Sequence, residues 1–188
     1  MRKVLYGAGM VVAAAAVVTI VTRANARPTS NDEVRRAALD DPTIVAIFDA
    51  ANTADIETGA LGAEKAQTKE VRDFGKMLAE VHTAVRKQGR DLAAKLKVTP
   101  TPPKDDQSAR DHAAVMQKLR GLSGPAFDRA FLEHEEAYHA AVINALRTTL
   151  IPAIQNKELK DFVVSLGPAF EAHRLGAENL LKKIPNAN

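Results

Sequence analysis

The sequence predicts an all-α protein built from four long amphipathic helices. Apolar residues recur at intervals of three and four along four separate stretches, which is the spacing of one buried helix face. No stretch alternates apolar and polar residues like a half-buried strand, and no strand-type hairpin turn occurs in the sequence. The chain has 188 residues, enough for a single domain with a buried core even without its first residues.

Residues 1–26 have the features of a secretory signal peptide. Arg2 and Lys3 form a short positive region, Val4–Val21 is an apolar run, and Ala24-Asn25-Ala26 has the small-x-small form of a cleavage site. We therefore expect cleavage after Ala26 and a periplasmic or secreted mature protein, without stable membrane insertion. The alternative is an uncleaved anchor, because about 18 apolar residues could just span a bilayer. The small residues and the polar segment that follows favour cleavage.

Charge and composition exclude several classes of function. The predicted leader contains Arg2, Lys3 and Arg23 and no acid, so 23 of the 26 basic residues belong to the mature chain, against 23 acidic ones. A nearly neutral domain without Trp has neither the basic surface nor the stacking residues that nucleic acids require. The chain has no Cys, which excludes disulfides, thiolate metal sites and cysteine nucleophiles.

The first two predicted helices form one pair. The first is expected to begin at Asp41-Pro42, because Asp is a favoured N-cap and Pro fits the first helical position, and to reach about Ala66. The second is expected from about Lys69 to Lys97. The proline-rich segment 98–103 ends it, because proline lacks the amide hydrogen and restricts the residue before it.

The remaining predicted helices follow the proline-rich segment 98–103. A short helix is expected over about Gln107–Leu119. The third long helix should run from Pro125 to about Leu150, where Pro152 stops or kinks it. The fourth should run from about Lys157 to Lys183, with a bend at Gly167-Pro168.

This order of helices predicts a ferritin-like four-helix bundle. Such bundles have one long crossover between the second and third helices, and residues 98–124 supply one that carries a short extra helix. We expect residues 27–40 to be a flexible N-terminal segment, because they are polar and mixed in charge, and residues 41–184 to form the bundle domain.

Each long helix places a titratable residue on its apolar face. Helical rise puts these residues at similar heights: the first two helices differ by roughly 4–5 Å and the last two by about 3 Å. A shared polar layer near the middle of the bundle is therefore expected. Its members are Asp55, His82, Glu135, His139 and His173.

The leading interpretation of this layer is a transition-metal site. Imidazole and carboxylate suit zinc, iron, copper or manganese, and bundle cores can hold such sites between facing helices. Glu136 and His139 have the Glu-x-x-His spacing of di-iron bundles, but helical phase puts Glu135 on the buried face and Glu136 at its edge. A di-iron set would also need a second Glu-x-x-His motif. The residue three positions before His82 is Ala79, and the one three positions before His173 is Phe170, so neither histidine has the required Glu.

The competing interpretation is a purely structural polar layer. His–Asp and His–Glu pairs can satisfy buried carboxylates inside a core without any metal. The chain also has no nucleophile elbow and no glycine loop that could cradle a phosphate, so the sequence assigns no catalytic residue.

Four segments lie at regular spacings before the histidines and within the first helix: Ala54-Asp-Ile-Glu-Thr-Gly59, Val71-Arg-Asp-Phe-Gly75, Phe127-Asp-Arg-Ala-Phe131 and Leu166-Gly-Pro168. In these segments and spacings the sequence resembles a bacterial family of exported, ferritin-like helical domains of unknown function, whose members are often labelled predicted outer membrane proteins. The resemblance covers about residues 43–183.

Two positions depart from the family pattern. The family usually has Asp before the histidine of the second helix, where this chain has Val81, and its first-helix acid is typically Glu, where this chain has Asp55. Both changes weaken a site that relies on carboxylates to orient imidazoles. The sequence thus predicts an exported, soluble bundle that binds a metal ion, or a non-catalytic structural or stress-related interaction module; it identifies no protein partner.

Overall fold

A computed structural model describes residues 39–104 and 106–184, and every regular element in this part of the chain is helical. The predicted signal peptide (1–26) and nearly all of the predicted flexible segment (27–40) lie outside the described residues. The elements are α3 (Asp41–Lys65), α4 (Lys69–Leu96), α5 (Ser108–Arg120), α6 (Gly124–Ala145), a π-helical segment η1 (Leu146–Leu150), α7 (Ile151–Ala153), α8 (Lys157–Ser165) and α9 (Gly167–Leu181).

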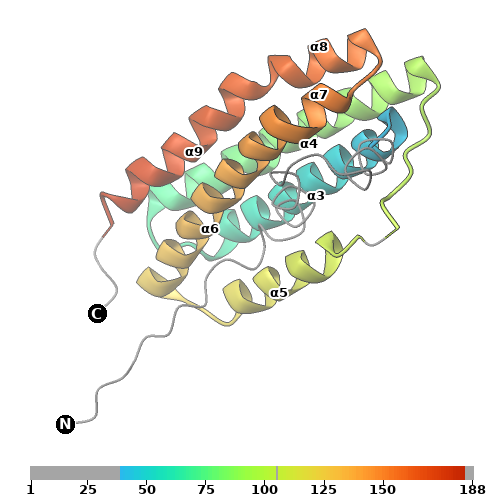
Figure 1. Cartoon of the computed structure of the whole chain (residues 1–188). Helices are drawn as coiled ribbons and strands as arrows, with labels where there is room; N and C mark the ends of the chain where they lie inside the picture. Colours follow the sequence, from blue (N-terminus) through green and yellow to red (C-terminus); the bar gives the residue numbers. More distant parts are fainter. Residues whose placement is uncertain (1–38, 105, 185–188) are drawn as a thin grey trace, which may run out of the picture.

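The helices pack in two pairs (Figure 1). Helix α3 packs mainly against α4, and α6 mainly against α9, while the short helix α5 lies beside α3 and α6. The α3–α4 pair is unusually close, because a Cβ atom added at Gly75 would lie 2.7 Å from the backbone nitrogen of Ala63 and the backbone oxygen of Gly59. Glycine at both positions allows the two backbones to approach. This approach brings the polar residues of the two helices together.

The first helix begins at Asp41, one residue earlier than predicted. Asp40, not Asp41, is the N-cap, and its carboxylate accepts a hydrogen bond of 2.9 Å from the amide of Thr43. Asp41 instead accepts hydrogen bonds of 2.9 Å from the amides of Gln155 and Asn156. Two consecutive Asp residues can divide these roles, so the start of α3 is tied to the loop between α7 and α8.

The third and fourth long helices are interrupted where the sequence has proline. The third widens into the π-helical segment η1 just before Pro152, which has no amide hydrogen to donate to the preceding turn. The fourth is divided into α8 and α9 at Leu166, immediately before Gly167-Pro168. Leu166 keeps helical dihedral angles, so α8 and α9 follow each other directly at the place where the bend is expected.

Two apolar clusters fill the interior, one toward each end of the helices. The first includes Ile44, Val85, Leu146 and Phe170, and the second includes Leu61, Leu78, Phe131 and Ala177. In α3, α4, α6 and α9, the five residues of the predicted layer lie between the positions that belong to the two clusters: Asp55, His82, Glu135, His139 and His173. The polar layer is therefore enclosed by hydrocarbon on both sides.

Candidate functional site

All five predicted site residues are buried in this layer. Their exposed fractions are 0% for Glu135, 1% for His82 and His139, 4% for Asp55 and 6% for His173. They form two overlapping groups, one of His82, His139 and His173 and one of Asp55, Glu135 and His139. In each group the candidate ligand atoms lie within 4.8 Å of one another.

The three imidazoles face one another from α4, α6 and α9. Their ring centroids are 5.6 Å apart for His82 and His139, 5.1 Å for His82 and His173, and 5.2 Å for His139 and His173. The Nε2 atom of His82 lies 3.2 Å from the Nδ1 atom of His173. Two nitrogens bound tetrahedrally to one zinc ion at about 2.0–2.1 Å would lie about 3.3 Å apart. The separation of these two nitrogens fits a hydrogen bond between the rings, and it also fits two ligands of a common ion.

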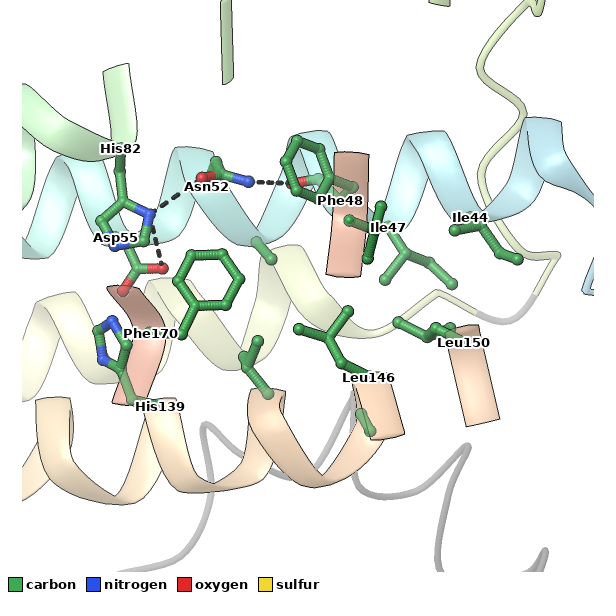
Figure 2. Close-up of a pocket in the computed structure, with 14 residues that line it drawn as sticks. Ile44, Ile47, Phe48, Asn52, Asp55, His82, His139, Leu146, Leu150 and Phe170 are labelled. Carbon is green, nitrogen blue, oxygen red and sulfur yellow. Dashed lines mark hydrogen bonds and ion pairs between the residues drawn. The ribbon is translucent and has the colours of Figure 1, made fainter. Parts of the chain in front are cut away.

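An asparagine fixes the protonation of His82. The side-chain amide of Asn52 donates a 2.8 Å hydrogen bond to the carbonyl of Phe48, so its oxygen must face His82. His82 Nδ1 donates a 2.9 Å hydrogen bond to that oxygen and also lies 3.5 Å from a carboxylate oxygen of Asp55 (Figure 2). Since Nδ1 holds the proton, Nε2 of His82 carries a lone pair, which accepts the 3.2 Å hydrogen bond from Nδ1 of His173.

His139 has the same arrangement on the neighbouring helix. Its Nδ1 donates a 2.9 Å hydrogen bond to the backbone carbonyl of Glu135, one turn earlier in α6. Its Nε2 has no hydrogen-bond partner among the described residues, although it is fully buried. Buried nitrogens are nearly always paired, so an unpaired one requires an explanation such as an ion or a water molecule.

The carboxylates of the layer are also without partners. Within the described residues, no hydrogen bond reaches either oxygen of Glu135 or Oδ1 of Asp55; the imidazole Nδ1 atoms of His139 and His82 lie 3.6 Å and 3.5 Å from these carboxylates. Burial raises the pKa of Glu135 to about 8, and the Thr58 hydroxyl opposes this rise in part. Burial, together with the nearby charge of Glu135, also raises the pKa of Asp55 well above its usual range.

The pKa values of the three imidazoles are lowered, whereas those of the carboxylates are raised. Burial and the neighbouring histidines lower the pKa of His82 to about 2, and burial followed by the charge of His173 lowers that of His139 to about 3. Burial also lowers the pKa of His173. At neutral pH the layer thus presents neutral imidazoles, which is the form that binds metals.

Glu136 lies outside this layer, as helical phase predicts. Its carboxylate pairs at 3.2 Å with Arg174, which also pairs with Glu171 and Glu178 on α9. His139 instead lies beside Glu135, with 3.6 Å between Nδ1 and a carboxylate oxygen. The Glu-x-x-His spacing of residues 136–139 therefore does not form a ligand pair.

The remaining two histidines belong to neither group. His112 pairs at 2.7 Å with the exposed Glu57, and His134 packs against the ring of Tyr138 at 5.6 Å. Asn52 is the residue of this layer that the sequence analysis did not include. Its position three residues before Asp55, on the same side of α3, is the signal that could have found it.

A narrow cavity of about 30 Å³ adjoins one side of the layer. Its polar end is formed by Asn52, Asp55, His82 and His139, and it extends along α3 and α6 toward Ile44 and Leu150 (Figure 2). The rest of its wall is apolar: Ile44, Ile47, Phe48, Ala51, Val142, Ala145, Leu146, Leu150, Val163 and Phe170. Glu135 and His173 do not line it.

Comparison with known proteins places the chain in a family without assigning an activity. Among the described residues, no helix has the length and apolar character needed to cross a membrane. Comparisons with curated proteins and with solved structures give no significant match. Residues 12–180, most of the chain, match the domain of unknown function DUF4142. The chain therefore belongs to the DUF4142 family, a family of unknown function.

Proposed function

We propose that the buried layer binds one divalent transition-metal ion through His82, His139 and His173, with Asp55 or Glu135 as a further ligand. The observation that carries this proposal is the convergence of three neutral imidazoles, two of them with a lone pair directed by a hydrogen bond on the opposite nitrogen. Three His and one carboxylate or water are a common ligand set for zinc, iron and copper, and manganese favours additional carboxylates.

The charge of the layer supports binding of a cation. A buried carboxylate without hydrogen bonds costs free energy, either as an ion or through the raised pKa that keeps it protonated. A metal ion would supply the missing positive charge for Asp55 and Glu135, whose unpartnered oxygens lie beside the imidazoles. Binding would then release protons from these acids, so affinity should increase with pH.

Asn52 and the backbone of Glu135 would act as orienting groups. Each accepts the Nδ1 proton of one imidazole and so keeps the Nε2 lone pair pointed toward the other histidines. The residues assigned here bind and orient an ion; none is assigned to catalysis.

Architecture and location belong to the same proposal. We infer a ferritin-like arrangement of α3, α4, α6 and α8–α9, with the long connection and α5 between the second and third long helices. We also infer export through a cleaved signal peptide at residues 1–26, on the charge, apolar and small-residue pattern of that segment. A soluble periplasmic or secreted metal-binding protein follows from the combination.

A structural polar layer is the alternative, and a specific observation favours it. His82 already makes side-chain contacts to Asn52 and His173 at hydrogen-bond distance, so part of the layer is satisfied without an ion. The unpaired Nε2 of His139 and oxygens of Glu135 weigh against it, because an internally satisfied layer would have paired them.

Metal analysis of protein purified without a histidine tag distinguishes the metal site from a purely structural polar layer. Wild type is expected to contain about one ion per chain after incubation with zinc and removal of the excess. His139→Ala should lose that ion, whereas His112→Ala, which removes a histidine outside the layer, should retain it. A wild type that stays metal-free and shows no change in melting temperature with zinc, iron, copper or manganese would support the structural alternative.

A further inference from the structure

The polar layer contains two carboxyl groups and no cationic side chain. Asp55 is 4% exposed and Glu135 is 0% exposed, and among the described residues no lysine or arginine is buried. The third buried acid, Asp128, lies elsewhere, because it accepts hydrogen bonds from the backbone amides of Gln67 and Thr68 at the turn between α3 and α4. In the part of the chain that the structure describes, the charge of the layer therefore depends on Asp55 and Glu135.

The arginines that are closest to the layer in sequence are engaged outside it. Arg86 lies one turn after His82, and its guanidinium donates a 3.0 Å hydrogen bond to the hydroxyl of Thr53. Arg174 follows His173 directly and pairs at 2.8–3.3 Å with three partly exposed acids: Glu136, Glu171 and Glu178. Neither guanidinium therefore neutralises the two carboxyl groups of the layer.

An ion in the layer would lie close to both carboxyl groups. The ligand atoms of Asp55, Glu135 and His139 lie within 4.8 Å of one another, and His139 also belongs to the group of three imidazoles. Figure 2 shows the carboxylate of Asp55 between the rings of His82 and His139. At such separations, charges in a buried environment interact far more strongly than in water. A carboxylate that does not coordinate the ion would therefore still contribute its charge.

Charge balance limits the ion that this layer can hold. Apolar clusters enclose the layer on both sides, and an uncompensated charge in such a place costs free energy. With neutral imidazoles, the two carboxylates balance the charge of a divalent ion. A trivalent ion would leave one positive charge uncompensated. A monovalent ion needs only one carboxylate, because the other acid can keep its proton.

We propose that the layer binds divalent ions with both Asp55 and Glu135 as carboxylates and rejects trivalent ions, so that it would hold iron as Fe(II) and not as Fe(III). The inference rests on the proposed metal site, because it gives that site its charge specificity. It concerns binding only and includes no redox step.

The test compares zinc(II) with copper(I), which have the same number of d electrons and differ by one unit of charge. Both affinities are measured by competition with a chelator, and the copper titration excludes oxygen. Glu135→Gln and Asp55→Asn each remove one negative charge with little change of shape. Glu136→Gln is the matched control, because it makes the same substitution one residue further along α6, where the carboxylate pairs with Arg174 outside the layer.

The preference for zinc(II) over copper(I) should fall in Glu135→Gln and in Asp55→Asn by about tenfold or more relative to wild type, which corresponds to about 1.4 kcal/mol. Glu136→Gln should keep the preference of wild type. An excess of gallium(III), which has the same number of d electrons and one more unit of charge than zinc(II), should not displace zinc from wild type.

An unchanged preference in a folded Glu135→Gln or Asp55→Asn variant would overturn the inference, and so would displacement of zinc by gallium(III). The two substitutions are independent, so one folded variant is sufficient for the test. Either contrary result would leave the metal site itself in place, because zinc still binds. A wild type that binds no zinc would instead refute the site and the inference together.

Discussion

The substitution Glu135→Gln tests the electrostatics of the layer in metal-free protein. The carboxyl group of Glu135 is 0% exposed, and burial raises its pKa from an ordinary value of 4.5 to about 8. Between these two values the folded chain holds a proton that the unfolded chain has released. The contribution of Glu135 to stability is therefore complete below pH 4.5 and is lost as the pH rises through 8.

The magnitude follows from the two pKa values. Between pH 5 and pH 7, Glu135 should lower the free energy of unfolding by about 2–3 kcal/mol, at up to 1.36 kcal/mol per pH unit. His82 and His139 act in the opposite direction. Their pKa values of about 2 and 3 lie below the ordinary 6.5, so their contribution is present above pH 6.5 and is lost as the pH falls. Wild type alone would thus show a mixture of both effects.

The difference between the two proteins contains the ionisation of Glu135 and the effect of its charge on the pKa of Asp55. Urea unfolding of wild type and Glu135→Gln, both with a chelator, should be measured at pH 5, 6 and 7. Glutamine has nearly the same shape and does not ionise, so the variant should gain about 2–3 kcal/mol relative to wild type from pH 5 to pH 7. A difference that stays constant over this range would refute the assignment of a protonated, buried Glu135 at neutral pH.

Three further predictions concern ligand orientation, helix packing and metal-linked stability. Asn52→Ala removes the acceptor for His82 Nδ1 and should lower zinc affinity about 10- to 100-fold in a calorimetric titration; an unchanged affinity would contradict its orienting role. Gly75→Ala places a methyl group against the backbone of α3 and should destabilise the fold by about 1–3 kcal/mol in thermal unfolding. Gly167→Ala has open space at its Cβ position and should be nearly neutral. Equal effects of the two substitutions would refute the close approach of α3 and α4. Zinc at 100 times its Kd should stabilise wild type by about 2.7 kcal/mol, and a chelator should reverse this; the same stabilisation in His139→Ala would exclude the assigned ligands.

The sequence predicted the residues of the layer well because helical periodicity determines which side chains face inward. The phase of α6 distinguishes Glu135 from Glu136, and the structure shows the first buried beside His139 and the second paired with Arg174. Counting residues from the turns also placed Asp55 and His82 at similar heights, and the two side chains lie 3.5 Å apart.

Features that depend on packing between helices could not be predicted in the same way. The cavity is the volume left between side chains of several helices, and no single helical pattern records it. The tautomer of His82 depends on which way the amide of Asn52 is turned, which only its bond to the Phe48 carbonyl reveals. The π-helical segment before Pro152 likewise reflects how one helix accommodates a missing amide hydrogen within its tertiary surroundings.

X-ray absorption spectroscopy of the zinc-loaded protein is the decisive test of the buried metal site, because it identifies the atoms bound to the ion. The zinc ion should have about three imidazole nitrogens at about 2.0–2.1 Å, together with a carboxylate or water oxygen. In His139→Ala the number of imidazoles should fall, and in His112→Ala it should not change. A spectrum with only oxygen ligands, or one that His139→Ala leaves unaltered, would contradict a metal site in the buried layer.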